Sequence, residues 1–330
     1  MDSLTHDPWM IGLSNVVMLG SAAAWIWIIW KRRTSGEVLP YEPRHAAPWG
    51  PGAALLTVVL VLLAVSSMFG SDETAATPQL QNSEQTAARI AALIASQLVF
   101  VGGFFAVMYV AYRATPRDLG LPRSGKEALR DVVIGVVTYF AAVLPVWVVQ
   151  GLLFWLLGRQ QELSQHELIK MIVDGTEVDT QVMLLACMSA VVVAPICEEV
   201  TFRLLFQGWL QKWEDGIVRI NVDGSPEEGT IQASNTTVED STKPLVTSGP
   251  APRGIAELPH GWLPIWASAL LFGLAHAGYG PEPVPLFLFG ILLGYVFQRT
   301  NRILPSIVAH ALFNGVTMLA LWRLIVVGAE

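Results

Sequence analysis

The sequence predicts an all-α membrane protein, a polytopic bundle in which about eight helices cross the bilayer. Composition is the first indication: 53% of the 330 residues are hydrophobic and 14% are charged, whereas soluble domains have about 45–50% and about 25%. The second is that the apolar residues fall into separate runs, each close to the roughly 17–25 residues that a transmembrane helix needs. The third is that Lys and Arg concentrate in alternate connecting segments.

The expected spans follow one another along the whole chain. Each is an apolar run with few charges, bounded by polar or proline-containing segments. They cover residues 9–30, 51–70, 90–112, 132–157, 181–210, 262–278, 284–298 and 303–327. The sixth and seventh are short and are separated only by GYGPEPVP, so they form either a tight pair of spans or partly re-entrant segments.

The first span is expected to stay in the protein rather than to be removed as a signal peptide. Its N-terminal flank, MDSLTHDP, is acidic, its apolar run continues through WIWIIW, and its positive charges follow it as KRR. A signal peptide has the reverse order, with positive charges before a shorter apolar run.

Orientation follows from the connecting segments. Lys and Arg gather after the odd-numbered spans, within residues 31–44, 113–130, 212–253 and 299–302, whereas residues 71–88 contain neither. Because cytoplasmic loops hold the excess of these residues, we expect both termini on the non-cytoplasmic side. The expected location is the cytoplasmic (inner) membrane.

Two regions differ from the rest of the chain. Residues 1–88 are expected to form an N-terminal pair of transmembrane helices with their loops, and residues 89–330 a second domain. Within that domain, residues 214–258 are acidic and rich in Ser, Thr, Gly and Pro, a composition that cannot bury enough surface to fold alone. We expect a disordered cytoplasmic insertion there, with a docking or regulatory segment as the alternative.

Several functions are excluded by the sequence. A net charge of −7 gives no basic surface for nucleic acid. The chain contains no Walker-type or GxGxxG loop for a nucleotide. Cys187 and Cys197 form no CxxC, haem or disulfide motif.

Only four acidic or histidine side chains lie well inside the predicted spans: Glu198, Glu199, His276 and His310. A charged residue at the bilayer centre costs about 2.5–3.5 kcal/mol on insertion scales, so such residues face protein or water rather than lipid. Buried polar residues of this kind indicate a functional site.

Spacing separates the two glutamates of PICEEVTFR. Glu199 and Arg203 are one helical turn apart and can form an ion pair, which favours a structural role for both. Glu198 points about 100° away around the helix and has no such neighbour in its own segment. It is therefore the carboxylate available for chemistry.

Two later spans add polar groups at the same four-residue spacing. Phe272 and His276 share one helical face, as do His310 and Asn314. Each cluster alone has a structural explanation, since an intramembrane His can bond a neighbouring carbonyl and an Asn can join two helices. Three such clusters together are what an intramembrane active site requires.

In chain order the clusters read Glu-Glu-x-x-x-Arg, Phe-x-x-x-His and His-x-x-x-Asn. This combination resembles the CPBP family, the CAAX-protease and bacteriocin-processing (Abi) intramembrane proteases, most specifically over residues 190–316. The resemblance implies a CAAX-protease-like core in residues 89–330 and hydrolysis of a peptide bond. It further implies the roles of single residues: Glu198 and His276 activate a water, His310 and Asn314 stabilise the oxyanion, and Glu199, Arg203 and Phe272 support the site.

The resemblance also implies the partners of the site. They are the lipid bilayer and a protein or peptide substrate, lipidated or not. A divalent metal such as zinc is an alternative to direct activation of water, with Glu198, His276 and His310 as its ligands. The zinc motif HExxH is absent, so we favour direct activation.

Two further functions are open alternatives. One is a proton- or cation-coupled membrane transporter, whose intramembrane carboxylates would relay ions. The other is a non-catalytic scaffold or immunity protein of the same fold.

Overall fold

The computed structural model describes residues 7–42, 49–52, 55–60, 62, 83–157, 180–223, 261–277 and 283–328, with the backbone alone for 216–223 and 324–328. Within these ranges every regular element is a helix. Six of the described helical segments are long and apolar enough to cross a membrane. The predicted all-α membrane bundle is therefore confirmed.

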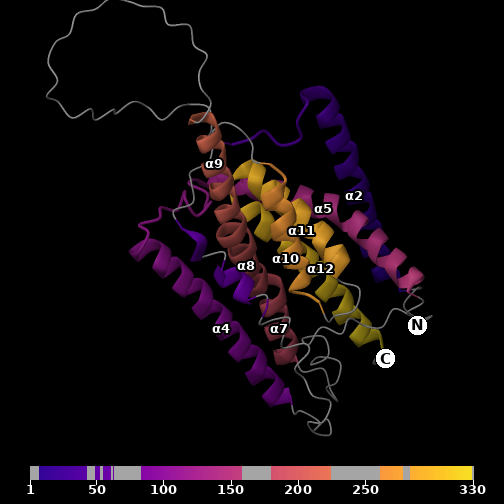
Figure 1. Cartoon of the computed structure of the whole chain (residues 1–330). Helices are drawn as coiled ribbons and strands as arrows, with labels where there is room; N and C mark the ends of the chain where they lie inside the picture. Colours follow the sequence, from indigo (N-terminus) through magenta and orange to yellow (C-terminus); the bar gives the residue numbers. More distant parts are fainter. Residues whose placement is uncertain are drawn as a thin grey trace, which may run out of the picture.

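Figure 1 shows the arrangement of the helices, with α2 and α4 on the outside of the bundle. One continuous helical run carries the Glu-Glu-x-x-x-Arg motif and divides into α7, η1, α8, η2 and α9. The bounds are α2 Pro8–Ser35, α4 Ser83–Val110, α5 Gly125–Leu156, α7 Thr180–Met188, η1 Ser189–Val193, α8 Ala194–Glu199, η2 Val200–Gln207, α9 Gly208–Asp223, α10 Leu263–Leu274, α11 Pro283–Thr300 and α12 Leu304–Gly328.

The count of eight full spans needs one correction. It leaves the predicted side of each terminus unchanged, because the start of α10 and the end of α11 lie side by side, where Gln298 donates to the Gly261 carbonyl. The sixth predicted span, 262–278, contains only α10, which has 12 residues. At 1.5 Å per residue α10 is about 18 Å long, less than the roughly 30 Å of a bilayer core. The second predicted span, 51–70, lies mostly outside the described residues.

Two predicted boundaries also differ from the structure. α4 begins at Ser83, so the domain boundary predicted after residue 88 falls inside a helix. α9 continues to Asp223, so residues 214–223 are helical rather than disordered. Because extending a helix costs far less than nucleating one, polar residues that follow a long apolar helix can continue it. Residues 224–258 of the predicted insertion lie outside the described residues.

The helix that carries the first motif is not a regular α-helix. At the ends of η1 and η2, the amides of Ala194 and Gly208 bond carbonyls five residues back, those of Ser189 and Arg203. Pro195, which follows η1, has no N–H to donate to the preceding turn. Short π-helical segments of this kind are frequent at functional sites, and these two flank the glutamates.

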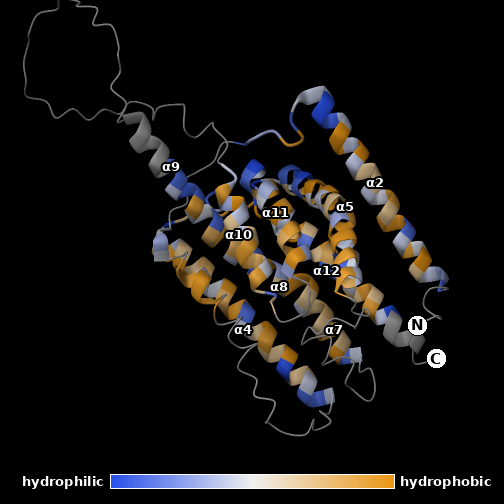
Figure 2. Ribbon diagram, turned by 45° about the vertical axis from the view of Figure 1, so that its right-hand side comes forward, coloured by the Kyte–Doolittle hydropathy of each residue, from blue (hydrophilic) through white to orange (hydrophobic). Residues whose placement is uncertain are grey.

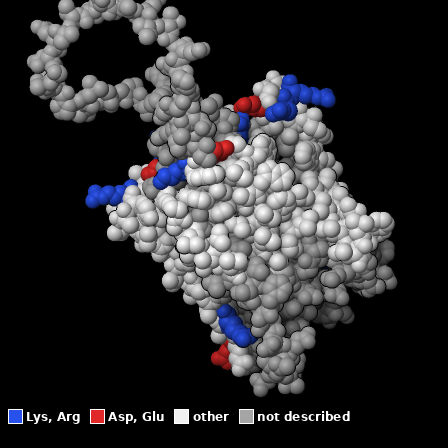
Figure 3. Space-filling model, viewed as in Figure 1, with Lys and Arg blue, Asp and Glu red and all other residues white. Residues whose placement is uncertain are grey.

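The surface of the bundle is that of a membrane protein. Figure 2 shows hydrophobic residues along the helices and hydrophilic ones mainly toward their ends. In Figure 3 the charged side chains gather at the two ends of the visible face, and its middle carries none. Large apolar side chains such as Val99 (75% exposed) and Trp155 (77%) point outward.

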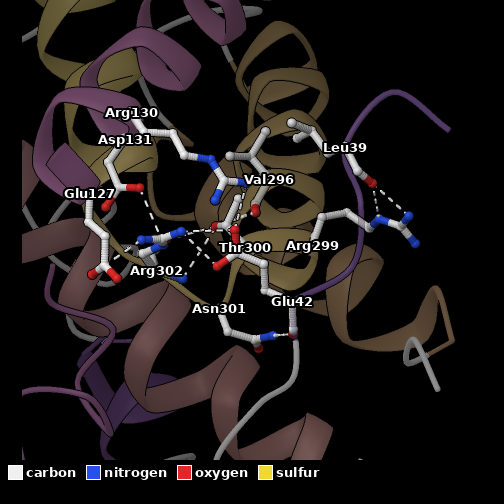
Figure 4. Close-up of polar contacts among 10 residues, drawn as sticks. All are labelled: Leu39, Glu42, Glu127, Arg130, Asp131, Val296, Arg299, Thr300, Asn301 and Arg302. Carbon is white, nitrogen blue, oxygen red and sulfur yellow. Dashed lines mark hydrogen bonds and ion pairs between the residues drawn. The ribbon is translucent and has the colours of Figure 1, made fainter. Parts of the chain in front are cut away.

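At one end of the bundle, an ion-pair network joins the segment after α2 to the α11–α12 turn and the start of α5 (Figure 4). Arg302 Nη2 donates to both carboxylate oxygens of Glu42 at 2.8 and 2.6 Å, and Arg302 Nε lies 3.3 Å from Asp131 Oδ1. Arg299 donates to the carbonyl of Leu39 at 2.8 and 2.6 Å. Three of the segments predicted to be cytoplasmic therefore meet on one side of the bundle.

A buried aromatic core supports the centre of the bundle. Phe202, Phe272 and Phe289, from η2, α10 and α11, are at most 5% exposed. Phe272 contacts the other two edge-on, with centroids 5.4 and 6.5 Å away. Gly290 lets α11 approach α10, because an added Cβ would lie 3.1 Å from Ala269.

Candidate active site

Residues of the three sequence clusters converge where α8, α10 and α12 meet. Glu198 and Glu199 are the last residues of α8. His276 lies in the turn that follows α10, and His310 is the seventh residue of α12. His310 is thus about 9 Å along its helix.

Glu198 lies between the two histidines. Its Oε2 is 3.9 Å from His276 Nε2 and 3.8 Å from His310 Nε2. The three side chains are 26%, 18% and 4% exposed, respectively. Among the described residues Glu198 Oε2 is buried and has no hydrogen-bond partner. One carboxylate oxygen and two imidazole nitrogens thus face a common point.

The other nitrogen of each ring fixes its orientation. His276 Nδ1 lies 2.8 Å from the carbonyl oxygen of Phe272, and His310 Nδ1 lies 3.0 Å from Glu199 Oε1. A carbonyl or carboxylate oxygen can only accept, so both Nδ1 atoms carry a hydrogen. Each Nε2 is therefore an acceptor when the ring is neutral and a donor when it is protonated.

Glu199 joins this site to the predicted ion pair. Its Oε2 accepts from Arg203 Nε at 3.0 Å, and both side chains are fully buried. Arg203 Nη1 donates to Ser268 Oγ at 2.9 Å, and Ser268 donates to the Phe202 carbonyl at 2.8 Å. The pair expected from the four-residue spacing is present, and its carboxylate also orients His310.

Aromatic rings line the same region. The Phe272 ring lies 5.1 Å from the His276 ring and 5.6 Å from the His310 ring, and Phe289 also lies 5.6 Å from His310. The Arg203 guanidinium lies 5.4 Å from the centroid of Phe272, within the range of a cation–π contact. Such apolar walls strengthen the electrostatic interactions between the polar groups.

Asn314 occupies a different position. It lies one turn after His310 on α12, and its Nδ2 donates to the carbonyl of Ala190 in η1 at 2.8 Å. In the part of the chain that the structure describes, no hydrogen bond joins it to Glu198 or to either histidine. Its oxyanion-stabilising role remains a prediction.

The C-terminal part of the chain matches a known family. A model described as type II CAAX prenyl endopeptidase Rce1-like matches residues 246–316, which include His276, His310 and Asn314. This match supports the resemblance to the CAAX protease (CPBP) family that the sequence motifs indicate. The chain is an integral membrane protein, as its six long apolar helices also indicate. No curated protein and no solved structure matches the chain.

The family match spans 71 residues and begins at residue 246, so it does not include the Glu-Glu-x-x-x-Arg motif of residues 198–203. The structure connects that motif to the matched part by the Glu199–His310 and Arg203–Ser268 contacts. Residues 198–203, which carry the first family motif, therefore contact the part of the chain that the family model matches.

The zinc alternative predicts that Glu198, His276 and His310 hold a metal ion. Within the described residues, no group of three or more His, Cys, Asp or Glu side chains is placed to hold a metal ion. Glu198, His276 and His310, the ligands expected for zinc, do not form such a group as they stand. We therefore derive no chemical step through a metal.

Sequence reasoning missed two residues that contact the site. Ser268 accepts from Arg203, and it is the only hydroxyl residue in LPIWASALLFGL, a signal that could have identified it. Phe289 packs against His310, and nothing in the apolar sequence of α11 distinguishes it from its neighbours.

Proposed function

We propose that the protein is an intramembrane endopeptidase that hydrolyses a peptide bond by means of a water activated by Glu198 and His276. The observation that carries this proposal is the position of Glu198 Oε2, 3.8–3.9 Å from two imidazole nitrogens that face it. A water that contacts these three atoms would have acceptors for its protons and a fixed orientation.

The reaction follows from the same contacts. Glu198 takes a proton from the water, whose oxygen attacks the carbonyl carbon of the substrate while His276 Nε2 accepts the second hydrogen bond. His310 in its protonated form donates Nε2–H to the oxyanion, and the buried Glu199 carboxylate at its Nδ1 stabilises that positive charge. Glu198 then gives its proton to the leaving amine nitrogen, and the C–N bond breaks.

The substrate we propose is a membrane-associated protein or peptide. The matching family is named for prenyl endopeptidases, so a peptide with a prenylated C-terminal cysteine is the first substrate to test. We further propose the inner membrane as the location, with both termini on the non-cytoplasmic side.

The test compares Glu198→Gln with the unmodified protein, both purified and reconstituted in liposomes. We expect cleavage to fall by about 10²–10⁴-fold, the usual contribution of a general base, with no loss of folded protein. Cys197→Ala is the matched control, because it changes the preceding residue and should leave cleavage intact. A Glu198→Gln protein that cleaves at the unmodified rate would disprove the proposal.

Two added measurements address the alternatives. Cleavage that persists in the presence of a strong chelator would support direct activation, and its loss with recovery on added zinc would support the metal mechanism. Proton uptake into liposomes without cleavage of any membrane peptide would instead favour the transporter.

A further inference from the structure

Five polar residues form a row along the helical run that carries the glutamates. They are Glu199, Arg203, Gln207, Gln211 and Glu214, spaced four, four, four and three residues apart. We call them the polar row. The mechanism proposed above uses only its first two residues, although the row continues for 11 residues beyond Arg203.

Glu199 faces His310 on α12, and from Arg203 onward the row faces α10, α11 and the residue just before α10. Arg203 donates to Ser268 on α10, as described above. Farther along, Gln207 Nε2 donates to the Gly294 carbonyl at 2.8 Å and Gln211 Nε2 to Gln298 Oε1 at 3.4 Å, both on α11. At the end of the row, Glu214 Oε1 accepts from the backbone N–H of Gly261, just before α10, at 2.8 Å.

The π-helical segment explains why the row stays aligned. In an α-helix, residues four apart advance by about 40° around the axis at each step, because a turn takes 3.6 residues. The wider π-helical turns of η2 rotate less per residue, which offsets that drift between Glu199 and Gln207. The interruption of the α-helix thus keeps the polar side chains in one interface.

Several atoms of the row are buried without a partner. Arg203 and Gln207 are fully buried and Gln211 is 5% exposed. Among the described residues, Arg203 Nη2, Gln207 Oε1 and Glu214 Oε2 make no hydrogen bond, and Glu198 Oε2 continues the series at the inner end. Buried polar atoms in native proteins are normally satisfied, and bound water is the usual partner where protein groups are missing.

The spacing of the row fits single water molecules. Four residues of helix rise about 6 Å, which equals two consecutive hydrogen bonds of about 2.9 Å. Gly294 lets the backbone of α11 approach Gln207 closely, since an added Cβ would lie 3.0 Å from Gln207 Oε1. One water can therefore bridge neighbouring residues of the row from Arg203 onward, whereas Glu199 and Arg203 bond each other directly.

We propose that the polar row holds a file of water molecules that leads from Glu214, at the end of the bundle, to Glu198. Its length is at most about 24 Å, because Glu198 and Glu214 are 16 positions apart and each residue rises by no more than about 1.5 Å. Each hydrolysis consumes one water, and the file would supply the next through an otherwise apolar interior. Gln207 and Gln211 are the positioning residues for this water. The supply role rests on the proposed peptidase function, whereas the water file itself does not.

Radiolytic hydroxyl labelling tests the file without any turnover. X-rays convert bound water into hydroxyl radicals that mark adjacent side chains, and the protein would be Glu198→Gln in lipid nanodiscs. Phe272 is the reporter, because it is fully buried and contacts Arg203. Trp49 is the matched control: it is 2% exposed, and its Nε1 donates to the Leu205 carbonyl of the same helix.

We expect Phe272 to be labelled well above Trp49 and its labelling to fall by up to about tenfold in Gln211→Leu, which removes one hydrogen bond from a bound water. Gln207→Met is the second variant, in case the first folds poorly. Labelling of Phe272 at the level of Trp49, or labelling unchanged by both substitutions, would overturn the proposal.

Kinetics test the supply role. In the active protein, Gln207→Leu should lower kcat by about tenfold without changing KM. Thr201→Val is the control, because Thr201 lies on the same helix and its hydroxyl bonds its own backbone at Cys197. A kcat unchanged in Gln207→Leu would refute the supply role, even where labelling has shown the water.

Discussion

Replacement of Arg203 by Met tests whether the buried ion pair holds the site together. Arg203 and Glu199 are both fully buried and 3.0 Å apart. Methionine keeps much of the length of the side chain and removes its charge, so Glu199 would be left as a buried carboxylate with His310 as its remaining partner. Removing one partner of a buried pair costs about 3–5 kcal/mol.

A second loss adds to this cost. Ser268 Oγ would lose the donor that it receives from Arg203, which is worth about 1 kcal/mol. The sum of about 4–6 kcal/mol is comparable with the whole stability of many domains. We therefore expect much less folded protein in the membrane, in contrast to Glu198→Gln.

The assay measures the free energy of unfolding of each variant by reversible unfolding in mixed micelles. Arg130→Met is the matched control, because Arg130 forms a 2.7 Å ion pair with Glu42 but its side chain is 48% exposed. Exposed pairs contribute about 0–1 kcal/mol. The double variant Glu199→Gln/Arg203→Met should lose less than Arg203→Met alone, since it leaves no buried charge.

Two results would refute this reasoning. One is a loss in Arg203→Met no larger than that in Arg130→Met. The other is a double variant whose loss of stability equals the sum of the losses in Arg203→Met and in Glu199→Gln, because the two residues would then act independently.

Three further predictions concern other parts of the chain. Gly120→Ala should destabilise the fold by about 1–3 kcal/mol, because its φ is +65° and a Cβ would lie 3.0 Å from the α11–α12 turn; Gly125→Ala, with open space around it, should be neutral in the same thermal melt. The hydrogen bond from Arg323 holds the pKa of Asp7 below its usual 3.8. The stability that ionised Asp7 contributes is therefore fully present above that pH and is lost as the pH falls through the lowered pKa. Melting temperatures at about pH 5 and about pH 3 should differ more in the unmodified protein than in Asp7→Asn. Asn314→Ala should lower kcat by about 10²-fold if its amide also reaches the oxyanion, whereas an unchanged kcat would leave it as a contact between α12 and η1.

The regular features of the sequence predicted much of this protein. Apolar runs of the right length identified the six long helices. The four-residue spacing of Glu199 and Arg203 predicted their ion pair, because neighbours at that spacing share a helical face. Glu198, without a partner in its own helix, was predicted to face other parts of the protein, and it lies beside two histidines.

Contacts between helices could not be predicted in the same way. Nothing in the sequence of α8 indicates that Glu199 bonds His310, 111 positions away. The π-helical turns were also missed: Pro195 interrupts the hydrogen bonding after η1, but nothing in the sequence VTFRLLFQ of η2 distinguishes it from an ordinary apolar helix. The position of Asn314 depends on the backbone of η1, and it was predicted from the family motif alone.

The attachment of α2 has a consequence for the surrounding lipid. This helix has 28 residues, about 42 Å, against a hydrocarbon layer of about 30 Å. Two ion pairs attach it to the bundle, each at 2.8 Å. Asp7, just before the helix, pairs with Arg323, and Glu37, just beyond its end, pairs with Arg299. Its inclination is therefore set by the protein. In thinner or thicker membranes the lipids next to α2 must stretch or compress, while the helix keeps its tilt.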